Sequence, residues 1–253
     1  MFSVLLKKYG RSFALLMLMV LLFEVATDLT GWLEPVLFPG LSKILPEFYK
    51  SLPKLIKGLF NSLSLLMPSY LSALVLGIGG GLLVGSSSVL RTMFMPIFRG
   101  VSPIPPTMLI PYAIAVLPTF WLSSAFIIFI GAFWPILMGT IHGVVLLEQR
   151  YLDNASTLGL RGFRLLRIVV FPGALPMIFS GAGMSLVFSF ILLTVAEMFG
   201  AKSGMGHFIQ YYADFSDYPK VLAGMLFMSL VIILIMELFD LVQRRMLHWT
   251  AKR

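Results

Sequence analysis

Apolar stretches about as long as a bilayer is thick recur along this sequence, and they restrict its fold more than any other feature. A transmembrane helix needs roughly 20 mainly apolar residues. Six candidates run over about 12–27, 59–84, 93–117, 121–141, 175–195 and 221–239. With 58% hydrophobic and 12% charged residues, the chain has about half the charged fraction of a soluble domain. These features predict an all-α polytopic membrane protein with six transmembrane helices and exclude an ordinary soluble enzyme.

The basic residues indicate the orientation of these helices, because Lys and Arg gather in cytoplasmic loops. With the N-terminus inside, most of the 19 Lys and Arg residues fall on the cytoplasmic side. We therefore expect both termini in the cytoplasm. The net charge of +8 then reflects topology and contact with headgroups, so we expect membrane lipids, and no nucleic acid, as partners. The first apolar run follows Lys7 and Lys8 as a signal peptide would, but we expect a retained helix.

The whole chain, 1–253, is expected to form one transmembrane domain. Its first part, 1–58, would hold the first helix and an external amphipathic segment, and 59–253 would form the core. The external segment contains Pro35, Pro39, Pro46 and Pro53, with apolar residues at near-helical spacing. It therefore either lies broken on the membrane surface or forms a plain connector.

The pattern of the longest cytoplasmic loop, 148–172, predicts two short helices with a break between them. Leu152, Ala155 and Leu158 repeat every three residues, and Gly159 stands where a left-handed C-terminal cap would end the first helix. The second helix would have an apolar face and an arginine face and end before Pro172, which begins the next span. The loop is either a docking element for another protein or a plain surface helix.

The residues of this loop resemble the "EAA" loop of permease subunits of binding-protein-dependent ABC importers, which has the form E-A-A, three residues, G, nine residues, I-x-L-P. The matching positions here are Asp153, Asn154, Ala155, Gly159, Val169, Phe171 and Pro172. In that family the helix before the Gly fits a cleft on the ATPase subunit. The resemblance implies a coupling role for Leu152, Asp153, Asn154, Ala155, Leu158, Gly159 and Pro172.

Further motifs resemble the nitrate/sulfonate/taurine branch of that family. They include Ser102-Pro103-Ile104-Pro105-Pro106, Gly131-Ala132-Phe133-Trp134-Pro135, Ala196-Glu197-Met198-Phe199-Gly200 and the closing Arg244-Arg245-Met246-Leu247-His248-Trp249. The resemblance implies the type I importer permease fold in a multi-pass protein of the bacterial inner membrane. It also implies a permease homodimer, an ABC ATPase subunit, and a periplasmic or lipid-anchored substrate-binding protein that delivers a small polar solute.

The energy source must lie on another polypeptide. A P-loop needs Gly-Lys followed by Ser or Thr, and no Gly-Lys pair occurs in the sequence. We therefore expect no cofactor on this chain, with ATP and magnesium bound by the partner subunit. His142 belongs at the inner face, His207 at the outer face and His248 in the C-terminal tail, so the predicted topology excludes a metal or hydrolase site shared by the three. The chain is expected to be a transporter subunit and not an enzyme.

Two groups of residues are candidates for the solute path. Glu197 is an acid near the outer end of the fifth predicted span, and ionisable groups at membrane depth are often functional. It would line an outer gate, with Thr194 and Ser189 facing the same path, or pair with Lys202 at the interface. The second group, Pro105, Pro106 and Pro111, removes backbone donors and either kinks a helix or forms a hinge.

A different class of function remains as the alternative, a stand-alone channel or an ion-coupled secondary carrier. Such carriers place paired ionisable residues near the bilayer midplane, and the predicted spans contain few. The second span instead carries Gly77, Gly81 and Gly85 at four-residue spacing, which predicts close helix packing.

Overall fold

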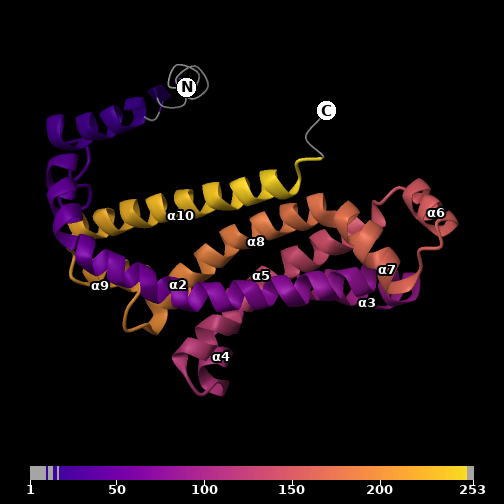
Figure 1. Ribbon diagram of the computed structural model, residues 1–253. Coiled ribbons are helices and arrows are strands. Elements are labelled where there is room, and N and C mark those ends of the chain that lie inside the picture. Colours follow the sequence, from indigo (N-terminus) through magenta and orange to yellow (C-terminus); the bar gives the residue numbers. More distant parts are fainter. Residues whose placement is uncertain (1–9, 11–13, 16, 250–253) are drawn as a thin grey trace. The chain divides into compact units, whose positions relative to one another are not determined.

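The computed structural model describes residues 10, 14–15 and 17–249 (Figure 1). The chain forms two compact units, one from 1–57 with 208–229 and the other from 58–207 with 230–253. Within the described ranges the regular elements are helices: η1 (Val25–Leu29), α2 (Leu41–Ser86), α3 (Ser88–Val101), η2 (Pro106–Leu109), α4 (Ile110–Val116), α5 (Phe120–Val145), α6 (Gln149–Thr157), α7 (Gly162–Leu165), η3 (Leu166–Val170), α8 (Phe171–Gly200), α9 (Met205–Asp214) and α10 (Tyr218–Met246). The all-α prediction is confirmed for this part of the chain.

Four helices of the described chain are long and apolar enough to cross a membrane: Leu41–Ser86, Phe120–Val145, Gly162–Gly200 and Tyr218–Met246. Each contains one predicted span, namely 59–84, 121–141, 175–195 or 221–239. The first predicted span, 12–27, lies partly outside the described residues. The span predicted over 93–117 does not form one continuous helix.

Proline chemistry explains the break within 93–117. The chain leaves α3 after Val101, passes through extended Pro105 at φ −61° and ψ 123°, and restarts as η2 at Pro106. Pro111 lies in the first turn of α4. Because proline has no N–H, it fits the first turn of a helix and disrupts the interior. These prolines therefore begin short helices, and the predicted bending of one long helix is wrong.

Helix α2 differs from the prediction in the opposite sense, since it runs without a break through Pro46 and Pro53 for 46 residues. At 1.5 Å per residue its length is about 69 Å, more than twice the bilayer core of about 30 Å. Its start is capped, because Glu24 Oε2 accepts the Leu41 N–H at 3.0 Å. Residues 41–58 thus belong to the same helix as the second span, and the break predicted at Pro46 and Pro53 is absent.

Glycines let the long helices of the second unit approach backbone to backbone. A Cβ on Gly77 would lie 2.8 Å from Ile136 Cγ2, and one on Gly85 2.9 Å from Val144 Cβ. On the other side of α5, a Cβ on Gly139 would lie 2.9 Å from the Met177 carbonyl oxygen of α8. The predicted close packing at the α2 glycines is confirmed, and α5 is held between α2 and α8.

Two buried hydroxyl groups cross-link the same three helices. Tyr70 of α2 donates to the Ala182 carbonyl of α8 at 2.8 Å, and Ser185 of α8 donates to the Ala132 carbonyl of α5 at 2.9 Å. In lipid, helices associate through close packing and such hydrogen bonds, because lipid tails are as apolar as the side chains. The α2–α5–α8 block is therefore the rigid part of this unit.

The glycine contacts predict opposite effects for two alanine substitutions in α2. Gly81→Ala places its Cβ against Thr140, whereas Gly79→Ala meets nothing within 4 Å. Alanine favours a helix over glycine by about 0.5–1 kcal/mol, and overpacking costs about 1–3 kcal/mol. We expect Gly81→Ala to lower the Tm of the purified protein by several degrees and Gly79→Ala to leave it equal or higher. Equal Tm values for both variants would contradict this packing.

Candidate functional site

The short helix α6 ends in the cap that the sequence predicts. Gly159 has φ +71°, the left-handed conformation that a C-terminal cap needs. The Leu160 N–H donates to the Ala155 carbonyl and the Gly159 N–H to the Ser156 carbonyl, both at 3.0 Å. These two hydrogen bonds end the helix at its C-terminal cap. Figure 1 shows α6 set off from the ends of α5 and α8.

The side chains of α6 divide into an inner and an outer set. Ala155 is buried, whereas Leu158 is 79% exposed and Asp153 and Asn154 are also exposed. Leu152 is partly buried and lines a cavity of about 590 Å³ behind the helix. The three apolar residues predicted as one stripe therefore have different roles, because Ala155 faces the protein and Leu158 is free to meet a partner.

The second half of the loop differs from the prediction. Residues 162–200 form 39 helical residues, in which α7 and a π-helical turn, η3, lead directly into α8. Pro172 lies in the first turn of α8. Because Pro172 offers no N–H, the helix upstream of it can take the wider π pattern without losing a backbone bond there. The predicted break after Gly159 is present, but the second helix does not end before Pro172, so α6 is followed by one helix that runs to the far end of the unit.

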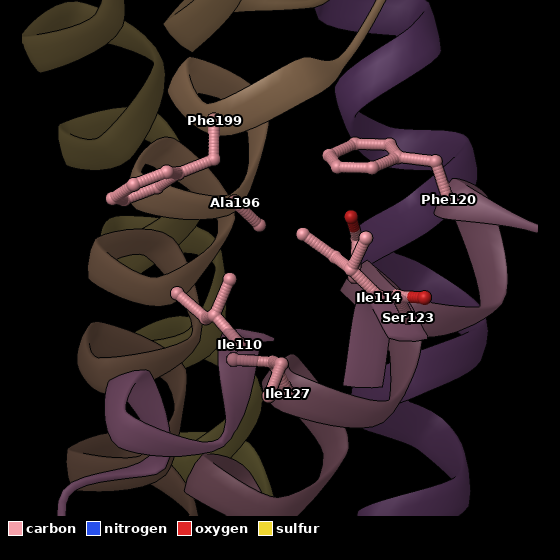
Figure 2. Close-up of a pocket in the computed structure, with 8 residues that line it drawn as sticks. Ile110, Ile114, Phe120, Ser123, Ile127, Ala196 and Phe199 are labelled. Carbon is pink, nitrogen blue, oxygen red and sulfur yellow. The ribbon is translucent and has the colours of Figure 1, made fainter. Parts of the chain in front are cut away.

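At that far end, which we call the distal end, three helices close on one another. Figure 2 shows side chains from α4, α5 and α8 gathered around a cavity of about 10 Å³, the space of a single water molecule. We call the residues around it the distal seal: Ile110, Ile114, Phe120, Ser123, Ser124, Ile127, Ala196 and Phe199. Ser123 fastens α5 to α4 by donating to the Ala113 carbonyl at 2.9 Å.

The candidate prolines lie beside the distal seal. A Cβ on Gly131 would lie 3.4 Å from Pro106 Cγ and would overlap the Leu192 side chain, so Pro106 packs where α5 and α8 meet. Pro105 and Pro111 are exposed. The three residues thus flank the same junction from different sides.

The candidate polar residues of α8 are bonded within the protein, with Ser189 and Glu197 buried and Thr194 partly buried. Ser189 donates to the Ser185 carbonyl and Thr194 to the Phe190 carbonyl, each at 2.8 Å, as hydroxyls in membrane helices commonly do. Glu197 is only 2% exposed. Its carboxylate accepts hydrogen bonds from Ser62 Oγ at 2.6 Å and from the Gly206 N–H at 2.7 Å. The alternative prediction that Glu197 pairs with Lys202 is wrong.

Sequence reasoning missed Ser62, which joins this group from α2. It donates to Glu197 and also accepts the Met205 N–H at 2.9 Å. Ser62 and Glu197 are 135 residues apart in the chain, and a serine in an apolar helix has no local pattern that marks such a partner. Only the packing of α2 against α8 reveals it.

Comparison with known proteins identifies the chain. Residues 73–248 match the family model described as "Binding-protein-dependent transport system inner membrane component". The chain belongs to this family. Its members are transport components, so the prediction that the chain is not an enzyme is confirmed, as is the predicted ABC permease class. The family and the apolar helices together make it a multi-pass membrane protein.

Individual members of the family are similar over most of the chain. The nitrate import permease protein NrtB of Synechocystis sp. is 31% identical over 68% of this chain and 63% of its own length. The taurine transport system permease protein TauC of Escherichia coli is 29% identical over 74% of this chain and 68% of its own. The nitrate and taurine relatives confirm the predicted branch, although the match spans less than two thirds of the Synechocystis protein.

A solved structure shares the fold. A chain from inward-facing conformations of the MetNI methionine ABC transporter superposes with a TM-score of 0.65, at 19% identity, over 78% of this chain and 98% of that chain. The predicted type I permease fold is therefore confirmed at the level of the matched helices, whereas the number of spans and the orientation of the termini remain predictions.

The distal seal gives a test of its tight packing. Ala196→Leu adds three carbon atoms beside a cavity of about 10 Å³, and overpacking costs about 1–3 kcal/mol. We expect a Tm several degrees lower by thermal unfolding in detergent. Met198→Leu, two residues along α8 at a side chain that is 40% exposed, is the matched control and should change nothing. An unchanged Tm for Ala196→Leu would show that the seal is loose.

Proposed function

We propose that this chain is the permease subunit of an ATP-driven ABC importer. Two copies form the path, an ABC ATPase subunit binds on the cytoplasmic side, and a periplasmic or lipid-anchored substrate-binding protein delivers the solute from outside. The observation that carries the proposal is the capped helix α6, which presents exposed Asp153, Asn154 and Leu158 in a chain of a transport family.

The coupling residues take distinct parts in this proposal. Asp153, Asn154 and Leu158 contact the ATPase cleft, while Ala155 and Leu152 seat α6 on the permease. Gly159 fixes the angle at which the chain leaves α6, and Pro172 begins the helix that carries the motion onward. Closure of the ATPase on ATP draws the two α6 helices together, and hydrolysis releases them, so the path alternates between two states.

The distal seal is the outer gate of the proposed path. In support, the tight cavity lies at the end of α5 and α8 that is remote from α6. Pro105, Pro106 and Pro111 border the gate as hinges, and Thr194 and Ser189 lie on the helix that closes it. Six spans, cytoplasmic termini, contact with lipids and a bacterial inner-membrane location complete the proposal.

The solute is a small polar molecule of the nitrate, sulfonate or taurine type, or a vitamin precursor. Support comes from the nitrate and taurine permeases among the relatives. ATP and magnesium are bound by the ATPase, because this chain lacks the Gly-Lys pair of a P-loop. The binding protein sets most of the selectivity.

Substitutions of Gly159 test the coupling role. Gly159→Val forces a β-branched residue into φ +71°, a conformation that such residues strongly avoid, and it should abolish uptake of labelled nitrate and taurine by cells. Gly159→Asn tolerates this conformation and should keep at least about half of the wild-type uptake. Membrane levels of both variants, measured by immunoblot, should match the wild type.

Full uptake by Gly159→Val at normal membrane level would contradict the coupling role of α6. Uptake of nitrate or taurine by vesicles that contain this chain and no ATPase would instead favour the channel or secondary carrier.

A further inference from the structure

The buried carboxylate of Glu197 joins three segments of the chain, and all the bonded residues belong to the second unit. Glu197 stands in the last turn of α8, Ser62 belongs to α2, and the Met205 and Gly206 N–H groups open α9. We call this set of hydrogen bonds, described above at 2.6–2.9 Å, the clasp.

Glycines make room for the clasp. Gly204 has φ +141°, and a Cβ there would overlap the Glu197 carboxyl group. A Cβ on Gly206 would lie 2.8 Å from the Thr194 carbonyl oxygen, and one on Gly58 would lie 3.2 Å from the Gly204 carbonyl carbon. The segment 204–206, where the loop after α8 enters α9, is therefore pressed directly onto α2 and α8, which leaves no space for a solute beside the carboxylate.

The clasp replaces a missing helix cap. The first N–H groups of any helix lack partners within it, and the preceding side chain commonly accepts one of them. Gly204 precedes α9 and has no side chain. Glu197 and Ser62 accept the N–H groups of Gly206 and Met205 in its place, and a negative charge at a helix N-terminus is also favoured by the helix dipole.

The last turn of α8, which carries Glu197, also contributes residues to the distal seal. Ala196 and Phe199 line the seal, as Figure 2 shows, while Glu197 between them is directed to α2 and α9. The clasp therefore fixes the turn that closes the proposed outer gate. We infer that Glu197 and Ser62 are positioning residues, which hold the loop 201–206 and the gate-closing turn of α8 in register without contacting the solute. Only the consequence for transport rests on the proposed function.

Two serines of α2 give a matched test. Ser62→Ala removes a hydroxyl of the clasp, whereas Ser69→Ala removes an equally buried hydroxyl that bonds only to its own helix, at the Leu65 carbonyl. Hydrogen–deuterium exchange of the full-length protein in lipid nanodiscs should show exchange at Met205 and Gly206 at least about tenfold faster in Ser62→Ala. Glu197→Gln, which turns one acceptor into a donor, should do the same, and Ser69→Ala should match the wild type. Unchanged exchange in Ser62→Ala and Glu197→Gln would overturn the clasp.

Uptake separates positioning from a merely structural role. With labelled nitrate and taurine as probes, Ser62→Ala should lower the maximal rate per permease several-fold and leave the half-saturating concentration within about twofold, because Ser62 does not contact the solute. A raised half-saturating concentration with an unchanged maximal rate would overturn the positioning role, because it would place Ser62 in contact with the solute. The proposed function fails if the wild-type chain shows neither uptake of a probe nor dependence on an ATPase. In that case the exchange result still decides whether the clasp holds the loop.

Discussion

The close approach of α2, α5 and α8 at glycine residues is the constraint on which the second unit depends. Side chains at Gly77, Gly85 or Gly139 would collide with the neighbouring helix, so these positions set the distance between helix axes. In lipid this contact replaces the hydrophobic effect as the main source of helix association. Hydroxyls of Tyr70 and Ser185 then fix the helices lengthwise. The resulting block gives the two candidate functional regions a common rigid support.

These two regions lie at opposite ends of one continuous helical run. Residues 162–200 start beside α6 and end at the distal seal and the clasp. A displacement of α6 reaches the far end through the short segment 158–161 and then through this helical run. The cavity of about 590 Å³ behind α6 gives that short helix room to shift, whereas the seal has space for one water at most. The end beside α6 is thus loosely packed, and the distal end is tightly packed.

The sequence predicted the features that arise from local chemistry. Hydrophobic runs located four spans, and Gly159 marked the end of α6 because a left-handed cap has few alternatives to glycine. The prediction was wrong where two local signals compete. Apolar character favoured one helix over 93–117, but the prolines decided the outcome there, whereas in 41–58 the cap from Glu24 and helix continuity prevailed over Pro46 and Pro53. The bond from Ser62 to Glu197 depends on helix register, which no local pattern shows.

The most direct test of the account is to identify what this permease carries with it. We would purify the tagged chain from its native membrane in mild detergent after light cross-linking and identify partners by mass spectrometry. The account predicts a P-loop ATPase in an amount about equal to the permease, cross-linked through residues placed at Asp153 or Leu158. A particle that contains no ATPase and still transports a solute would contradict the central claim.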